Sequence, residues 1–218
     1  FIVALSFSIA KSPNFINNST FSHGNAEVIL NGNTVQNIDI GTNAFYNLTL
    51  SGSGTKSLTG NLSIENNLEN QSTFNAQTYT IDIQGDWNGA GTFNPVTSSV
   101  IFNGANSQDI ERAVDFHDLT IANTNNTTAI SLGDPVTVTG TLNLNDGIVE
   151  TNSSNLLILA DGAVLGNSSI NSYVNGSMRK TGDEDFVFPI GSGSQYARLG
   201  ISGLTTVSSF TAAYYGSS

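Results

Sequence analysis

The densest run of acidic side chains in the sequence is Asp183-Glu184-Asp185, directly after Gly182. Carboxylate oxygens on a turn can bind Ca²⁺, which takes roughly 6–8 oxygen ligands. Three consecutive carboxylates reach one ion only if the chain loops around it, and the sequence contains no glycine- and aspartate-rich nonapeptide of the calcium-binding β-roll kind. A solvated turn is therefore the preferred interpretation. A calcium site is the alternative, and calcium is the one cofactor left open.

Acid–base and nucleophilic catalysis have few candidate residues. His23 and His117 are the only histidines, and the chain has no Cys. A catalytic histidine needs an orienting acid and a nucleophile or substrate beside it. Asp118 is close to His117 in sequence, but strand alternation puts it on the opposite face. We therefore interpret His117 as a surface strand residue and name no catalytic residue.

Cleavage of acidic polysaccharides, a known activity of parallel β-helices, would need a base and charge-stabilising groups gathered in one groove. The chain has only six Lys and Arg residues in 218, and Arg112 alone lies in the middle of the repeat region described below. A shared fold does not establish a shared function. We therefore expect that the protein is not an enzyme.

Aromatic side chains next to Asn and Asp can form platforms for sugar rings, which makes glycan binding the main rival to a purely structural role. The candidates are Tyr46, Tyr79, Trp87 and Tyr196. Trp87 aligns with Phe15 in the repeat, so a repeated packing role is preferred for it.

Two adjacent tyrosines, Tyr214 and Tyr215, close the last predicted strand. Neighbouring residues of a strand point to opposite sides, so the two rings cannot both face one core. At least one ring is expected to be exposed or to contact a following domain. This pair is the candidate ligand or interface site.

Composition narrows the class of partner. The net charge of -11 argues against nucleic acid or an anionic membrane surface. Charged residues make up 11% of the chain, against roughly 25% in an ordinary soluble domain. The polar surface comes instead from 28 Asn, 27 Ser and 23 Thr. Together with the absence of Cys, this is typical of a secreted bacterial protein, and no apolar run reaches the roughly 18 residues of a membrane span.

The sequence repeats itself at a spacing of about 72 residues, a sign of a repeat architecture. Three segment pairs keep this spacing to within one position: Phe15–Phe21 with Trp87–Phe93, Val28–Gly32 with Val100–Gly104, and Phe45–Leu50 with Phe116–Ile121. In a fourth pair, Leu58–Ile64 with Val138–Leu144, the spacing is eight positions wider. We attribute the wider spacing to an insertion in the loop from Asn123 to Asp134.

Pairs of apolar residues separated by one position recur at a mean step of about 18 residues, and each has the alternation of a half-buried strand. The pairs are Val28/Leu30, Leu48/Leu50, Leu62/Ile64, Ile81/Ile83, Val100/Phe102, Leu119/Ile121, Leu142/Leu144 and Leu157/Leu159. We predict an all-β fold, a parallel β-helix with coils of about 18–20 residues, in which each pair stacks on its predecessor. The inward residues would include Leu48, Leu62, Ile81, Val100, Leu119 and Leu142. A series of antiparallel sandwiches is the alternative.

The pattern changes after about Asn171, where Ser172 to Lys180 carries two of the six basic residues. We therefore predict a solenoid region over 1–170 and a β-rich region over 171–218. The second region is expected to be either a cap or the start of a following domain, because an open solenoid end exposes an unpaired strand edge.

Several of these segments resemble a repeat of very large surface proteins in Bacteroidota. The resemblance is carried by Thr92-Phe93, Ser99 to Gly104, Gln108-Asp109-Ile110, Phe116 to Ile121 and Val138 to Leu144. Val174 to Lys180, followed by Phe186 to Gly191, is similar to a module that often follows those repeats. The resemblance covers roughly residues 15 to 201, and its motifs are distinctive in their order.

The resemblance implies export to the bacterial cell surface, commonly by type IX secretion, and a role in adhesion or surface architecture. The sorting domain of such substrates is not evident, and the chain does not begin with Met, so we interpret it as a fragment of a longer protein. The expected function is an extracellular, non-enzymatic structural or adhesive segment. The expected partners are neighbouring domains, surface glycans or other cell-surface proteins, with no nucleic acid and no membrane insertion.

Overall fold

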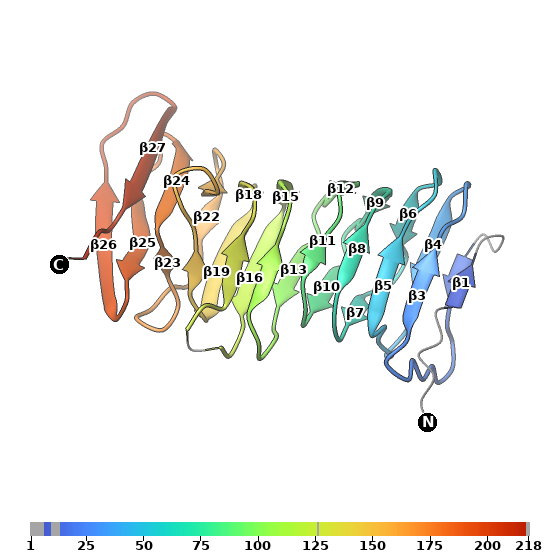
Figure 1. Ribbon diagram of the computed structural model, residues 1–218. Coiled ribbons are helices and arrows are strands. Elements are labelled where there is room, and N and C mark those ends of the chain that lie inside the picture. The colour runs from blue at the N-terminus through green and yellow to red at the C-terminus, as the bar shows by residue number, and fades with distance from the viewer. Residues whose placement is uncertain (1–6, 10–13, 126, 217–218) are drawn as a thin grey trace.

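A computed structural model describes residues 7–9, 14–125 and 127–216 and shows a β-solenoid of about 9 turns (Figure 1). The described residues form strands and no helix, so none could cross a membrane as a helix. Coils stack along one axis from the N-terminal to the C-terminal end, and successive coils pair in parallel. The predicted parallel β-helix is confirmed.

Each full coil visits three faces in turn. Sheet A follows one face: β1 (Phe7–Ile9), β3 (Glu27–Leu30), β5 (Asn47–Leu50), β8 (Leu68–Asn70), β11 (Trp87–Asn88), β14 (Gln108–Ile110), β17 (Ile130–Leu132), β20 (Val149–Glu150), β23 (Val174–Asn175), β25 (Phe186–Ser192) and β26 (Gln195–Ile201). Sheet C follows another: β7 (Leu62–Ile64), β10 (Thr80–Ile83), β13 (Ser99–Phe102), β16 (Asp118–Ala122), β19 (Thr141–Asp146) and β22 (Val164–Leu165).

The remaining face is divided between two sheets. Sheet B contains β2 (Asn14–Ile16), β4 (Gln36–Asp39), β6 (Lys56–Leu58), β9 (Thr73–Asn75) and β12 (Thr92–Asn94). Sheet D contains β15 (Val114–Phe116), β18 (Val136–Val138), β21 (Leu157–Leu159), β24 (Ser177–Gly182) and β27 (Ser208–Ala213). Strand β12 contacts β15 but does not pair with it, so the backbone ladder of this face is interrupted there.

The six residues predicted to point inward are all buried. Five of them form one ladder through sheet C, in register from coil to coil: Leu62, Ile81, Val100, Leu119 and Leu142. Alternation explains this burial, because each strand turns every second side chain into the core.

The prediction that all eight apolar pairs stack in one ladder is wrong. The first two pairs, which begin at Val28 and Leu48, lie in sheet A, and the last pair, which begins at Leu157, lies in sheet D. The two shortest steps of the series, from Leu48 to Leu62 and from Leu142 to Leu157, therefore mark a change of face within a coil. Each face is about one third of a coil, and alternation on every face produces the same sequence pattern.

The long repeat does not return to the same face. Val28 lies in sheet A, whereas Val100, its counterpart in the second copy, lies in sheet C. The path runs from β3 through β5 and β8 to β11, and then through β12 to β13. One repeat therefore advances the chain by three coils and two further faces.

The fourth pair of repeated segments advances by four complete coils, because Leu62 and Leu142 both lie in sheet C. The three ladder steps from Leu62 to Leu119 are equal, and the step from Leu119 to Leu142 is longer by four positions. The predicted insertion thus explains only half of the eight extra positions, and the additional third of a coil supplies the rest.

Each repeat contains a triad of aromatic rings at matching positions. Phe15, Phe21 and Phe45 form the first, with ring centroids 5.0–5.8 Å apart. Trp87, Phe93 and Phe116 form the second, with centroids 4.9–5.8 Å apart. In the second triad, Phe93 comes from β12 and Phe116 from β15, so aromatic packing joins sheets B and D where the backbone ladder is interrupted.

Buried polar side chains satisfy the backbone at the corners. The amide oxygen of Gln36 accepts a hydrogen bond from Gly32 N at 2.8 Å, and Gln108 does the same for Gly104 N at 2.9 Å. Lys56 is fully buried, and its ammonium donates to the Gly32 and Gly54 carbonyls at 3.2 and 2.6 Å. Such pairing is needed because an unpaired buried polar group is costly.

Asparagines link successive coils on the outside, which gives the Asn-rich composition a structural reason. Asn47 Oδ1 accepts Asn67 N at 3.1 Å, and Asn67 Oδ1 accepts Asp86 N at 2.9 Å. Asp86 Oδ1 then accepts Asp109 N at 2.9 Å. In each case the side-chain oxygen of an Asn or Asp accepts a hydrogen bond from a backbone N–H of the next coil.

The C-terminal region continues the solenoid before its pairing becomes antiparallel. Strand β23 pairs in parallel with β20, and β24 with β21. The hairpin β25–β26 then ends sheet A, and β27 pairs antiparallel with β24 to end sheet D (Figure 1).

Candidate functional site

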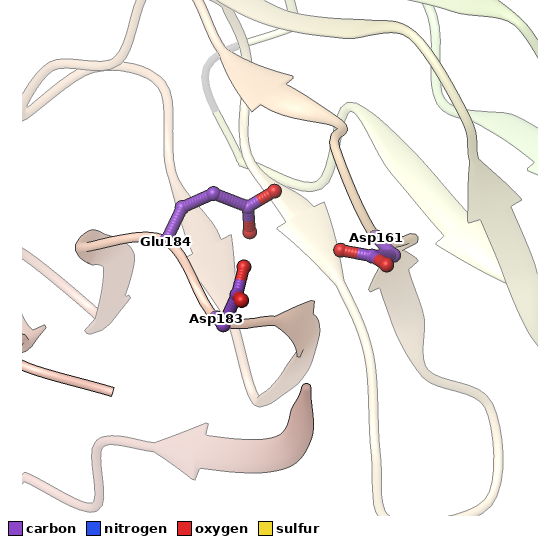
Figure 2. A group of neighbouring side chains, drawn as sticks. All are labelled: Asp161, Asp183 and Glu184. Atoms are coloured by element: carbon purple, nitrogen blue, oxygen red, sulfur yellow. The ribbon is translucent and has the colours of Figure 1, made fainter. Parts of the chain in front are cut away.

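Two places in the structure gather chemically active side chains. The first is an acidic cluster formed by Asp161, Asp183 and Glu184, shown in Figure 2. Asp161 lies in the turn between β21 and β22, and the other two lie in the turn between β24 and β25. One carboxylate oxygen of each lies within 4.8 Å of the others, and all three residues are exposed. The cluster could supply three of the roughly 6–8 oxygens that calcium takes.

A lysine already neutralises part of this cluster. Lys180 Nζ lies 3.1 Å from Glu184 Oε2, and it also donates to the Ala160 and Thr181 carbonyls. The hydrogen bond from Lys180 is the main reason that the pKa of Glu184 lies below its ordinary value. The other oxygen, Oε1, accepts Gly162 N at 2.9 Å. Glu184 is therefore oriented by the protein itself, which limits its capacity for a metal.

The structure brings together only part of the predicted calcium group. Asp183 and Glu184 belong to the cluster, but Asp185 Oδ1 accepts Gly203 N at 2.9 Å. Sequence reasoning missed Asp161, because it lies in the turn of an earlier strand, far from Asp183 along the chain. The sequence signal that could have identified Asp161 is the Asp161-Gly162 turn that follows β21 in the preceding coil. Calcium binding itself stays a prediction.

Both ring nitrogens of His23 are engaged. Nδ1 accepts Asn25 N at 3.0 Å, and Nε2 lies 3.1 Å from Glu65 Oε2. The ring stacks on Tyr46 with centroids 5.7 Å apart. His117 lies at the corner between β15 and β16, and not within a strand. Neither geometry provides a histidine with a nucleophile.

The predicted aromatic platforms are mostly packed. Tyr79 packs against the core, and Trp87 is only 3% exposed, which confirms the packing role preferred for it. The Tyr196 hydroxyl lies 2.8 Å from Ser168 Oγ.

The two C-terminal tyrosines do not close the last strand as predicted: β27 ends at Ala213, so strand alternation does not apply to them. One ring is nevertheless exposed. Tyr214 packs against the core and Tyr215 is 83% exposed. An interface at this pair stays a prediction.

The second place is a pocket of about 360 Å³ where sheet B gives way to sheet D. Its walls are Gly89 to Phe93 on the β12 side and Arg112 to Asp115 on the β15 side, with Trp87 between them. Gly89, with φ +98°, and Gly91 pack so closely on the coil below that a Cβ would clash with backbone atoms. Sequence reasoning named Trp87 and Arg112 but did not predict the interrupted ladder that forms the pocket.

Arg112 is the cation of this pocket. It is exposed, and its guanidinium forms no ion pair or hydrogen bond with any described residue. A neighbouring hollow shares Gly89 and Arg112 and is lined also by Glu69 and Glu111. The site thus combines a free guanidinium and nearby carboxylates with the aromatic rings of Trp87 and Phe93.

Comparison with known proteins adds no relative: no protein-family model, no curated protein and no solved structure matches the chain.

Proposed function

We propose that this chain is an extracellular, non-enzymatic structural segment of a large bacterial surface protein, serving as a stiff spacer or adhesive surface. The observation that carries this proposal is the unbroken succession of coils, each hydrogen-bonded to the next along sheet A (Figure 1). Stacked strands with a continuous core resist bending and local opening, because each coil is held by both neighbours.

The surface of the chain supports the same proposal. A net charge of -11 with few charged residues keeps a long, exposed body soluble without attracting nucleic acid. Coil-to-coil Asn bonds tie the exterior as well as the core. The resemblance to Bacteroidota surface repeats, and with it type IX export, belongs to this proposal.

Limited proteolysis of the native protein tests the spacer role. A stiff solenoid should be cut only at rates set by global unfolding, so cleavage within residues 27–182 should accelerate steeply near the unfolding temperature. Cleavage between coils at a rate independent of global stability would contradict the proposal. A matched destabilised variant should be cut faster in proportion to its loss of unfolding free energy.

The absence of catalysis is part of the proposal and has its own test. We expect no turnover of pectin, alginate or other acidic glycans, because the chain has only six basic residues to stabilise developing negative charge and no Cys. Product formation that is abolished by Arg112→Ala would overturn this expectation.

Glycan binding is a second candidate function, and the pocket beside Trp87 favours it. Aromatic rings, a free guanidinium and carboxylates on a rigid scaffold are the groups that bind sugars. A glycan array probed with the intact chain tests this candidate in its general form.

A further inference from the structure

We propose that the pocket between β12 and β15 binds a neutral saccharide through an acetamido group. This inference rests on the glycan-binding candidate and names its site and its ligand class. Strand β12 pairs only with β9, and β15 only with β18, so two strand edges face each other across the pocket without a ladder between them. Strand edges offer N–H and C=O groups to a ligand that can both donate and accept.

The first repeat contains a matching pocket at equivalent positions. It is lined by Asn17 to Thr20 and by Gly41 to Asn43, which precede the second-repeat pocket residues by one repeat length. Each pocket adjoins its own aromatic triad and the corner that follows Phe15 or Trp87. The two pockets are therefore the same structural feature in the two repeats.

A carboxamide from the chain itself bridges the first pocket. Asn43 Oδ1 accepts Phe21 N at 3.1 Å, and Asn43 Nδ2 donates to Ser19 O at 2.9 Å. The amide thus uses its donor and its acceptor to join the two walls. In the second repeat the segment from Glu111 to Asp115 is one residue shorter than its counterpart and contains no Asn or Gln. The second pocket has the same form without the amide that spans the first.

The second pocket also offers donors that the first lacks. Trp87 replaces Phe15, and its indole N–H forms no hydrogen bond with any described residue and is not among the buried unpartnered side-chain atoms, so it is open to solvent. Arg112 adds a free guanidinium at the rim. An amide carbonyl is an acceptor for both groups, and hydrogen bonds to the charged guanidinium are the stronger kind.

The charge around the pocket selects a neutral ligand. Asp115 lines it, and Glu69 and Glu111 line the adjoining hollow, so three carboxylates surround the one guanidinium. An anionic sugar would be repelled at this surface, whereas sugar hydroxyls can donate to these carboxylates. A sugar with an acetamido group meets both conditions: it supplies the amide that the second pocket lacks, and it carries no negative charge.

The test measures binding of N,N′-diacetylchitobiose to the whole chain by calorimetry, with cellobiose as the control that lacks acetamido groups. The disaccharide should bind and cellobiose should bind at least about tenfold more weakly, the loss of one good hydrogen bond. Trp87→Phe removes the indole N–H together with the five-membered ring and keeps an aromatic ring, as Phe15 has at the matching repeat position. It should weaken binding about tenfold, as should Arg112→Ala, whereas Arg198→Ala, which changes an exposed arginine of β26, should not.

The other possible results separate the ligand class, the site and glycan binding itself. Equal affinity for cellobiose would overturn the ligand class. Disaccharide binding unchanged by both Trp87→Phe and Arg112→Ala would overturn the site but leave glycan binding elsewhere on the chain. Failure of every sugar to bind, in calorimetry and on an array, would overturn glycan binding altogether. Thermal unfolding of each variant confirms that a loss of binding is not a loss of fold.

Discussion

Phe15 and Trp87 occupy the same position in the repeat and the same place in an aromatic triad, yet Phe15 lies in sheet B and Trp87 in sheet A. The repeated sequence therefore encodes a local unit of ring packing and corner geometry, and not a fixed face of the solenoid. Because the three faces present similar inward alternation, the unit can be placed on more than one of them.

The inward ladder of sheet C should be intolerant of charge. Leu119→Asp buries an unpaired carboxylate and should lower the free energy of unfolding by more than about 4 kcal/mol. Thr120→Asp places the same charge on the outer side of β16 and should cost less than about 1 kcal/mol. Denaturant unfolding measures both, and equal losses would mean that the facing of β16 is wrong.

The buried glutamine at the second corner should be as important as a core hydrophobe. Gln108 Nε2 donates to the Ile83 and Gly85 carbonyls, and its Oε1 accepts from Gly104 N and from the buried Asn123 Nδ2. Gln108→Leu leaves all four groups without this partner and should cost about 2–4 kcal/mol in unfolding free energy. Gln71→Leu, at an exposed glutamine, is the control and should change little. If Gln108→Leu left the free energy of unfolding unchanged, water would have to replace the hydrogen bonds of the glutamine.

Much of the fold could be predicted from the sequence, because alternation and spacing reflect burial directly. The ladder from Leu62 to Leu119 is an example, since its equal steps are each the length of one coil. The pairs at Leu48 and Leu157 were assigned to the wrong ladder because inward alternation looks the same on every face. Only pairing partners distinguish a change of coil from a change of face.

The candidate sites were less accessible to prediction. Asp183 and Glu184 were found because they are adjacent, while Asp161 joins them only through the stacking of coils. The pocket beside Trp87 depends on a missing pairing between β12 and β15, and no residue type encodes a missing pairing. Its one visible signal was the single-residue shortening between Gln108 and Phe116 relative to the first repeat.

Lys56 should give the protein an alkaline pH dependence. Burial lowers the pKa of Lys56 below its ordinary value of 10.5. Between the pKa of Lys56 in the folded state and its pKa in the unfolded state, the unfolded chain binds more protons. The free energy of unfolding should therefore rise with pH in the window below 10.5. Lys56→Met should abolish that rise, which denaturant unfolding at several pH values would measure.

The same variant tests the hydrogen bonds of the buried ammonium. At pH 7, Lys56→Met removes the hydrogen bonds to the Gly32 and Gly54 carbonyls, of which Gly32 O keeps the Gly54 N–H, and should cost about 1–3 kcal/mol. A gain in stability instead would show that the cost of burying the charge exceeds those two bonds.

Glu184 should contribute a pH dependence of the same sign in the acid range, where stability again rises with pH. Its pKa is lowered in the folded protein, chiefly by Lys180, so its contribution is present above the unfolded pKa and is lost as pH falls through the folded value. Glu184→Gln should flatten the decline of stability in acid. Glu111→Gln, at an exposed acid without an ion pair, should leave the decline unchanged; equal flattening by both would refute the assignment.

Any calcium effect should depend on the cluster that the structure assembles. If added Ca²⁺ raises the unfolding temperature, Asp161→Asn should remove the increase because it deletes one of the three converging carboxylates. Asp185→Asn is the matched control and should retain it, since Asp185 bonds to Gly203 instead. If Asp185→Asn removed the increase and Asp161→Asn did not, the consecutive carboxylates Asp183 to Asp185 would be the binding group instead.

Each repeat advances the chain by three coils and two faces. Successive repeats are therefore rotated by two thirds of a turn about the solenoid axis. Two successive copies of any surface feature, including the pocket beside each aromatic triad, therefore look out in different directions. A third copy at the same phase would cover the remaining direction, and a fourth would return to the first. An array built on this spacing would display its features around the whole circumference, so that attachment would not require the rod to rotate toward its target.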